Sequence, residues 1–551
     1  MFHFLHGYDP VLWAGYEKHG LIGENDGVRL VMSHHIPEEL KFNQLAAKGG
    51  ALWNILAEGK RPLYIDRLQG GLQIYDYDFD MELVEEYRKL LGDEFLGFQI
   101  HEWMSNYQSD IQKCKDVAAE DWKAENLHKA IYNVHPCLPI LLESMKMDEF
   151  EAGGKPKSAE QFYKTVTDMY LDRVKRYKDI VAVDSGYIMY PFEAENGVNM
   201  IMPEIGGSAY KGVILQMSYA RAVAKAYGTK FGSYYEPWGG QPFSACMYQE
   251  DGRNEWHLDK ASAFPYETGG ATGGSSRSCQ WRIYLYSILS GVEYISEEWG
   301  AYNTFVDADC QTLSEYGLVK KKFLDFVHKY TDLGEKVAPI AVVLSNKLPT
   351  YVVPRQNESH VGDQIDTLYR FPVDEKLGNE LRNVREGVDY IYRRTTEMLG
   401  SEPKGLINAI VPDAVDMLNE GDGKALSQYK YLINLTQEAE FATKHDNIIP
   451  YEQVEEKLAE LLPYSVEGPV HKVLNECTSG GYYLTVFNHS GVVRTVADGE
   501  YKLDEATAQA TVTLKEAGKT LTLLEGDGEL VEKDGVYHLT IPAGGYMFMK
   551  F

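Results

Sequence analysis

Short apolar runs, most of them ending in a polar or acidic residue, recur through the first three hundred residues. Eight runs follow this pattern: Phe2–Asp9, Arg29–His35, Pro62–Arg67, Phe95–Glu102, Ile180–Asp184, Met200–Glu204, Phe231–Glu236 and Val292–Glu298. Segments with apolar residues at helical spacing lie between many of these runs. Alternation of this kind is typical of a parallel sheet with helices outside, and eight such strands predict a (β/α)8 TIM barrel.

The helical segments have recognisable ends. They are Phe42–Glu58, Met81–Leu91, Ala159–Lys178, Tyr210–Tyr227, Ser276–Ser290 and Leu318–Thr331. Four of them stop at a glycine, which favours a helix C-terminus. The pattern is less regular in two places, because no helix is evident between Asp184 and Met200 and the stretch from Glu102 to Ile180 is longer than one crossover needs. An insertion beside the barrel mouth, or a shift of one in the strand count, would explain this.

Two further domains are predicted after the barrel, which should occupy residues 1–336. Apolar strands at Pro339–Ser345, Ala414–Asn419 and Tyr429–Leu435, with a helix at Val454–Leu462, predict a small α/β domain over residues 337–466. From residue 467 to residue 551 the apolar positions alternate between turn signals such as Asp527–Gly528. That period of two predicts a C-terminal antiparallel β-sandwich.

Composition narrows the possible partners. The formal net charge is -28 with no long cluster of Lys or Arg, so nucleic acid is not an expected partner. No segment approaches eighteen consecutive apolar residues, and no membrane association is expected. Six scattered cysteines lack metal-ligand spacing and suggest no disulfide framework. The N-terminus does not resemble a signal peptide, which fits a cytoplasmic protein, or a periplasmic or extracellular one if a signal has been removed.

Two glutamates at predicted strand ends are the main candidates for chemistry. Glu102 ends the fourth run and Glu236 ends the seventh. Strands of a TIM barrel bring their C-terminal ends to one mouth, and a pair of carboxylates there can break a glycosidic bond. Apolar neighbours would raise the pKa of one of them so that it could donate a proton. For either residue alone, the alternative is a structural carboxylate that binds loop amides or an arginine.

Other residues at the strand ends are predicted to bind the substrate. They are His35, Asp66, Arg67, His101, Trp103, Glu204, Tyr235, Trp238, Glu298 and Trp299. The tryptophans each follow a strand-end glutamate, which favours stacking on sugar rings. If the strand count is shifted by one, Glu298 would replace Glu236 and Glu204 could be the proton donor. The adjacent His34 and His35 would point to opposite faces of one strand, so no metal site is expected. No cofactor is expected either.

In the order of its three domains, the chain resembles a family of β-galactosidases. The middle domain of that family has an amidotransferase-like (flavodoxin-like) fold and mediates trimerisation. The resemblance rests on PIAVVLS (Pro339–Ser345), AVDML, YKYLINL (Tyr429–Leu435) and the closing IPAGGYMFMKF. In the wider clan, the acid/base glutamate ends strand four and the nucleophile ends strand seven, which implies Glu102 and Glu236 with retention of configuration. The clan usually has Asn before the acid/base, whereas His101 stands there in this chain.

The resemblance implies a retaining glycoside hydrolase acting on a neutral carbohydrate, and a homo-oligomer formed through the middle domain. Two other readings remain open at the level of sequence. One is a carbohydrate-binding protein that has lost catalysis, because His101 departs from the clan pattern. The other is a barrel lyase or isomerase acting on sugar acids, which would need basic residues such as Arg67 at the strand ends.

Overall fold

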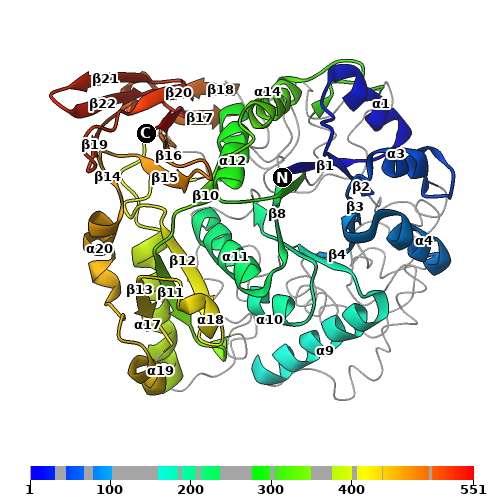
Figure 1. The fold of residues 1–551 in the computed structure, drawn as a ribbon, viewed down its shortest axis with the longest axis horizontal. Helices are drawn as coiled ribbons and strands as arrows, with labels where there is room; N and C mark the ends of the chain where they lie inside the picture. Colours follow the sequence, from blue (N-terminus) through cyan, green and yellow to red (C-terminus); the bar gives the residue numbers. More distant parts are fainter. Residues whose placement is uncertain are drawn as a thin grey trace.

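The computed structural model describes residues 2–30, 45–66, 79–101, 159–183, 189–205, 212–235, 276–297, 304–307, 309–348, 375–399, 406–436, 438–495 and 499–551 of the 551-residue chain. Three structural units follow one another along the sequence (Figure 1). A parallel barrel is followed by a small unit with a parallel sheet, called the middle unit below, and then by antiparallel sheets, called the C-terminal unit.

The barrel is closed by eight parallel strands. They are β1 (His3–Gly7), β2 (Gly27–Leu30), β3 (Leu63–Ile65), β4 (Phe95–His101), β5 (Ile180–Val183), β6 (Met200–Met202), β8 (Lys230–Tyr235) and β9 (Tyr294–Glu297). Each strand pairs with the next, β6 pairs with β8, and β9 returns to β1. The predicted TIM barrel is therefore confirmed, and every strand overlaps its predicted run, although β2 begins two residues and β8 one residue before it. The two-residue strand β7 (Glu204–Ile205) extends the sixth position past Pro203 and pairs with β8.

The described barrel helices correspond in order to the predicted ones, except for α1 and α10, which were not predicted. They are α1 (Pro10–His19), α3 (Ala51–Gly59), α4 (Met81–Leu91), α9 (Ala159–Tyr177), α10 (Tyr190–Glu195), α11 (Val213–Tyr227), α12 (Arg277–Leu289) and α14 (Glu315–Lys329). Helix α4 has the predicted bounds, because the Asp80 side chain accepts hydrogen bonds from the amides of Glu82 and Leu83 and Gly92 ends the helix at positive φ. The expectation of no helix between residues 184 and 200 was wrong, since the short helix α10 lies there.

Strand β4 contains a bulge that decides which of its side chains face the barrel interior. Leu96 belongs to the inner apolar cluster, whereas Phe98 and Ile100 belong to the outer core. The register shifts at Gly97, which has φ +113° and whose Cβ position would lie 2.4 Å from the Asp179 carbonyl oxygen. Glycine is required there because a side chain would collide with the neighbouring backbone.

The middle unit is built on a three-stranded parallel sheet in the order β12-β11-β13. Its strands are β11 (Ile340–Leu344), β12 (Val415–Asn419) and β13 (Tyr431–Asn434). Helices α17 (Glu375–Tyr392), α18 (Gly423–Leu426), α19 (Ala439–Lys444) and α20 (Val454–Leu461) complete it. The three strands and helix α20 correspond to predicted elements, whereas α17, α18 and α19 were not predicted.

The C-terminal unit contains two larger antiparallel sheets and a hairpin. The first sheet has the order β10-β15-β16-β23-β20 and the second has the order β14-β19-β22-β21. Their strands are β10 (Glu335–Lys336), β14 (Tyr464–Glu467), β15 (His471–Glu476), β16 (Tyr482–Phe487), β19 (Ala508–Leu514), β20 (Thr522–Gly526), β21 (Glu529–Lys533), β22 (Val536–Ile541) and β23 (Tyr546–Lys550). The hairpin joins β17 (Val492–Thr495) and β18 (Gly499–Lys502). Because β10 and β14 belong to these sheets, both lie across the predicted domain boundaries.

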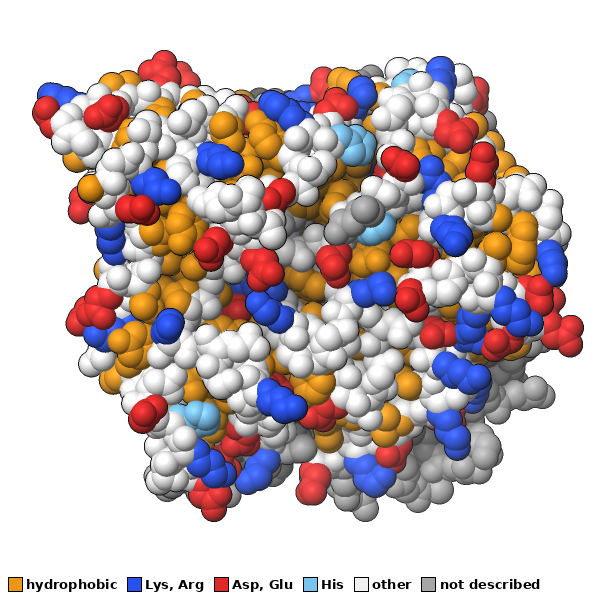
Figure 2. All heavy atoms as spheres, viewed as in Figure 1, with side chains coloured by type: hydrophobic (Ala, Val, Ile, Leu, Met, Phe, Trp, Pro, Cys, Tyr) orange, Lys and Arg blue, Asp and Glu red, His pale blue; other side chains and the backbone are white. Residues whose placement is uncertain are grey.

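Helices α11 and α12 lie between the barrel and the other two units (Figure 1). Apolar side chains from all three units form one continuous buried core. On the face shown in Figure 2, basic and acidic side chains are interspersed over the described residues. None of the helices in the described part of the chain combines the length and the apolar content needed to cross a bilayer.

Candidate active site

Two hydrogen bonds cross the barrel interior and mark the side chains that face it. Arg29 on β2 donates to the Tyr234 hydroxyl on β8 at 2.6 Å, and the hydroxyls of Tyr64 on β3 and Ser296 on β9 lie 2.6 Å apart. Neither pair of strands is adjacent in the barrel. Both bonds must therefore pass through the interior, near the C-terminal ends of the strands where barrel enzymes place their active sites.

Arg29 also forms a buried ion pair with Asp66, which directly follows β3. The Arg29 Nε lies 3.1 Å from Asp66 Oδ2, and the Arg29 Nη2 contacts the same oxygen. Burial opposes the charged form of Arg29, but Asp66 and the phenols of Tyr234 and Tyr64 hold its pKa well above the usual value. Arg29, Asp66 and Tyr234, called the mouth cluster below, therefore keep a cation at the barrel mouth at every accessible pH.

The opposite arc of the inner wall is mostly apolar. Leu96 on β4, Val181 and Val183 on β5, and Met200 and Met202 on β6 form the inner cluster there. Gln99 on β4 is a polar side chain in the same arc, since it pairs in register with Val181. The wall of the mouth is thus divided into a cationic arc on β2, β3 and β8 and an aliphatic arc on β4 to β6.

Glu204 is the predicted strand-end glutamate that lies within the described residues. It pairs in register with Tyr234, so the two side chains share the inner face of the barrel. Glu204 is partly exposed. A partly exposed carboxylate on the inner face can contact a ligand in the mouth, as predicted for this residue, and that role is untested.

Tyr235 and Glu297 face the other side of the wall. The Tyr235 ring packs edge-on against Tyr284 of α12, with centroids 5.6 Å apart. Glu297 binds Lys320 of α14 at 2.5 Å and accepts a hydrogen bond from Tyr284. Both side chains lie in the layer between barrel and helices, so the inward-facing tyrosine of this strand is Tyr234, and the substrate-binding role of Tyr235 stays a prediction.

Most of the other predicted site residues lie outside the described residues. Glu102 and Glu236 directly follow the last residues of β4 and β8, the fourth and seventh strands of the barrel. The predicted substrate-binding residues outside the described ranges are His35, Arg67, Trp103, Trp238, Glu298 and Trp299. His101 is the last residue of β4, and the structure describes only its backbone.

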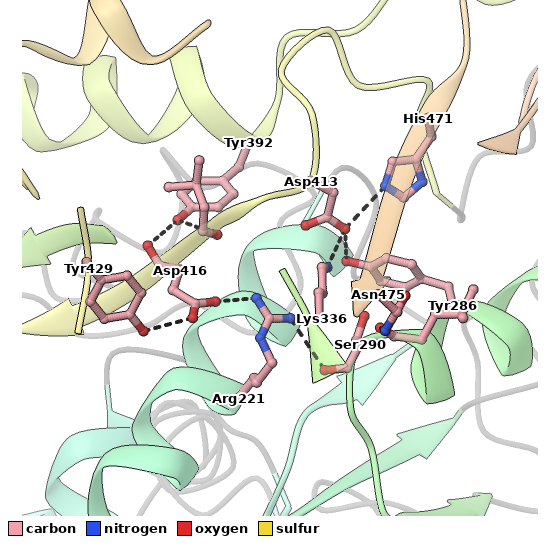
Figure 3. A network of polar contacts seen from close by, with 12 residues as sticks. Arg221, Tyr286, Ser290, Lys336, Tyr392, Asp413, Asp416, Tyr429, His471 and Asn475 are labelled. Atoms are coloured by element: carbon pink, nitrogen blue, oxygen red, sulfur yellow. Dashed lines mark hydrogen bonds and ion pairs between the residues drawn. The ribbon is translucent and has the colours of Figure 1, made fainter. Parts of the chain in front are cut away.

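A second buried polar group lies where the three units meet (Figure 3). Asp413 binds Lys336 at 2.6 Å, the Tyr286 hydroxyl at 2.7 Å and His471 Nε2 at 3.3 Å. His471 Nδ1 in turn lies 3.1 Å from His489 Nε2. We call Tyr286, Lys336, Asp413, His471 and His489 the junction cluster. Its carboxylate is more than 95% buried, so it must be matched by these neighbours.

Burial governs protonation in the junction cluster. Burial lowers the pKa of Lys336 to about 8 despite the attraction of Asp413. Burial would raise the pKa of Asp413, but Lys336, His471 and Arg221 hold it below its usual value. Burial also lowers the pKa of His471, and burial together with Arg282 and His471 lowers that of His489 strongly. Both histidines are therefore neutral near pH 7.

No group of three or more His, Cys, Asp or Glu side chains able to hold a metal occurs among the residues that the structure describes. Within the same residues, Cys279, Cys310 and Cys477 are buried.

Comparison with known proteins finds similar three-dimensional structures but no similar sequences. No family model matches the sequence. No curated protein matches it either. Among solved structures, α-L-fucosidase isoenzyme 2 from Paenibacillus thiaminolyticus aligns over 100% of this chain and 99% of its own, with 10% identity and a TM-score of 0.46.

Two other glycosidase structures are similar to the same extent. The β-galactosidase from Halorubrum lacusprofundi covers 100% of this chain and 99% of its own, with 10% identity and a TM-score of 0.42. The catalytic module of a family 98 glycoside hydrolase from Streptococcus pneumoniae, in complex with the LewisY pentasaccharide, covers 100% and 98%, with 9% identity and a TM-score of 0.41. At these values the likeness assigns neither a family nor an activity.

Proposed function

We propose that the protein is a retaining glycoside hydrolase that acts on a neutral carbohydrate at the barrel mouth. In this proposal Glu236 attacks the anomeric carbon. Glu102 protonates the leaving oxygen and then deprotonates the water that releases the sugar. The observation that carries the proposal is the division of the inner wall into a cationic arc and an aliphatic arc, because a two-carboxylate mechanism needs one ionised and one protonated carboxyl group.

The cationic arc suits the nucleophile. Glu236 follows Tyr234 by two residues, so alternation along β8 would place it on the same side as Tyr234 and near Arg29. A nearby cation stabilises the carboxylate form and lowers its pKa. Because Arg29 does not lose its proton, this effect would hold over the whole working pH range.

The aliphatic arc suits the proton donor. Glu102 follows β4, and the next two strands around the barrel, β5 and β6, present Val183 and Met202 to the interior. Alternation along β4 would give His101 the inner face and Glu102 the outer one, so this role requires the chain to turn Glu102 inward after β4. Low polarity raises the pKa of a carboxyl group and keeps it protonated near neutral pH. Glu204 is the alternative donor, since its register with Tyr234 directs it into the mouth.

The alternative of a lyase or isomerase acting on sugar acids needs a basic residue at the strand ends to hold the substrate carboxylate. Arg29 already contacts Asp66 and Tyr234, and Arg67 lies outside the described residues. The amidotransferase-like character of the middle domain, and an oligomer formed through it, belong to the same proposal, and light scattering of the full chain would test the oligomer.

Variants of Glu236, Glu102 and Glu204 test the assignment of the catalytic residues. Their rates are compared on aryl glycosides with good and with poor leaving groups. Glu236→Ala should lower kcat on the order of 10⁴-fold or more for both kinds, because it removes the attacking group. Glu102→Ala should lower kcat/KM roughly 10²- to 10⁴-fold for poor leaving groups and much less for good ones that need no proton, whereas kcat should fall for both, because release of the sugar also needs Glu102. Glu293→Ala, at the exposed opposite end of β9, is the control and should keep the wild-type rate.

Azide separates the two roles. In Glu102→Ala it should attack the glycosyl-enzyme and give a glycosyl azide with retained configuration, whereas in Glu236→Ala a single displacement would invert it. If Glu204→Ala behaves as expected for Glu102→Ala, the donor is Glu204. A Glu236→Ala enzyme with near-wild-type rates, or glycan binding by the wild type without any product, would contradict the proposal.

A further inference from the structure

The helices on either side of β8 in the chain are buried on nearly all faces. Helix α11 precedes β8, helix α12 follows it, and every residue of α12 from Cys279 to Leu289 is buried. A barrel helix ordinarily buries one face against the strands and exposes the other to water. Here the outer faces are covered by the middle and C-terminal units.

Polar contacts fix α11 to the middle unit (Figure 3). Arg221 forms a buried ion pair with Asp416 on β12, and Asp416 also accepts a hydrogen bond from Tyr429 at 2.8 Å. Two residues before Arg221, the Tyr219 hydroxyl donates to Asn419 at the end of the same strand. Directional bonds of this kind set the position of the helix along β12 as well as its distance from it.

Helix α12 is fixed to the C-terminal unit in a similar way. The Tyr286 hydroxyl donates to Asp413, which also holds Lys336 of β10 and His471 of β15. At the end of the helix, Asn475 Nδ2 of β15 donates to the Leu289 carbonyl oxygen at 2.8 Å. The first sheet of the C-terminal unit is thereby tied to the last turn of α12.

We propose that the two outer units hold β8 in place through α11 and α12, and that Arg221 and Tyr286 are positioning residues for the carboxylate at the end of β8. This inference rests on the proposed function, because it gives the position of Glu236 a catalytic meaning. A reacting group has to lie about 3–3.5 Å from its target, and a displacement of 1 Å can cost on the order of 100-fold in rate. A strand carrying the nucleophile therefore gains from support on its outer side.

The test compares two substitutions of one kind. Tyr286→Phe removes one fully buried hydroxyl that donates at 2.7 Å to Asp413. Tyr87→Phe removes an equally buried hydroxyl that donates at 2.7 Å to the Ala46 carbonyl oxygen, within the barrel itself. Tyr286→Phe should lower kcat on an aryl glycoside about 10-fold with KM changed less than about 2-fold, whereas Tyr87→Phe should leave both near wild type.

Arg221 gives a second pair of variants. Arg221→Met should lower kcat, and Arg221→Lys, which keeps a cation beside Asp416, should recover most of the loss. All kinetics are measured well below the unfolding temperature of each variant. A purely structural role would lower the unfolding temperature and leave kcat unchanged, and this result would overturn the proposal, as would equal losses of kcat in Tyr286→Phe and Tyr87→Phe.

Hydrogen exchange separates this inference from the proposed function. In Tyr286→Phe, amide exchange of Lys230–Tyr235 should rise relative to that of Ile180–Val183, and in Tyr87→Phe it should not. If the wild type hydrolyses no glycoside but exchange in β8 rises, the proposed function fails and the support of β8 stands. If the wild type is active and neither exchange nor kcat responds, the support of β8 is wrong.

Discussion

The mouth cluster and the junction cluster are each built around one buried aspartate, but they differ in the side chains that bind its carboxylate. Asp66 is matched by Arg29, whose guanidinium stays charged. Asp413 is matched by Lys336, with its pKa lowered to about 8, and by the neutral His471. The charge at the barrel mouth is therefore independent of pH, whereas the contact between the units responds to it. The difference shows that burial alone does not determine how an ion pair behaves.

The largest expected effect comes from replacing each aspartate by asparagine. Asp66→Asn leaves Arg29 buried without its carboxylate, which should cost about 3–5 kcal/mol of unfolding free energy at any pH. Asp413→Asn should cost less, because Lys336 can lose its proton when the carboxylate is gone, and the cost should shrink between pH 7 and pH 9. Chemical denaturation at the two pH values measures both. Equal costs that do not change with pH would remove the distinction between the clusters.

An effect of intermediate size comes from the histidines of the junction cluster. His471 donates from Nε2 to Asp413, and its Nδ1 shares one proton with His489 Nε2, a contact that requires at least one of the two rings to be neutral. Their folded pKa values lie below the usual value, so below pH 6.5 the unfolded chain binds protons that the folded protein does not. Stability should be fully present above pH 6.5 and decrease as the pH falls, by at most about 1.4 kcal/mol per pH unit for each histidine.

His489→Gln should reduce this slope between pH 6.5 and pH 5. Asp66→Asn is the control, and it should keep the wild-type slope because Arg29 does not titrate in that range. Unfolding free energies measured across the range give both slopes. An unchanged slope in His489→Gln would mean that other groups cause the acid sensitivity.

The smallest effect is expected where the barrel interior holds a neutral hydrogen bond. Tyr64→Phe removes the bond between Tyr64 and Ser296, which should cost about 1 kcal/mol, equally at pH 6 and pH 8. The measurement is the shift of the denaturation midpoint at both pH values. A cost that varied with pH would show that this pair is coupled to the charged groups of the mouth cluster.

Much of the fold could be predicted from the sequence because its elements have local signals. Each barrel strand is a short apolar run with a polar end, and α4 begins at a capping aspartate and ends at a glycine. Helix α10 was missed because six residues that include Pro191 are too few to show helical periodicity. The positions of β10 and β14 were missed because their partner strands follow much later in the chain.

The candidate site was less predictable because it depends on which way neighbouring side chains face. Tyr234 and Tyr235 are adjacent in a strand that is buried on both faces, so its sequence shows no alternation to tell them apart. The contact between Arg29 and Tyr234 joins residues 205 positions apart, and only barrel closure brings them together. The catalytic roles of Glu102 and Glu236, and the domain boundaries at 336 and 466, stay predictions.

The complete burial of α12 also has a consequence for how the protein is made. The Leu289 carbonyl oxygen is bonded by Asn475, 186 residues later in the chain, and Trp281 packs against Tyr546 with ring centroids 5.4 Å apart. During synthesis the barrel strands emerge from the ribosome well before these partners. A polypeptide terminated near residue 336 would expose the outer side of α12 to water, so we expect it to aggregate, and the nascent barrel would reach its final packing only when translation is almost complete.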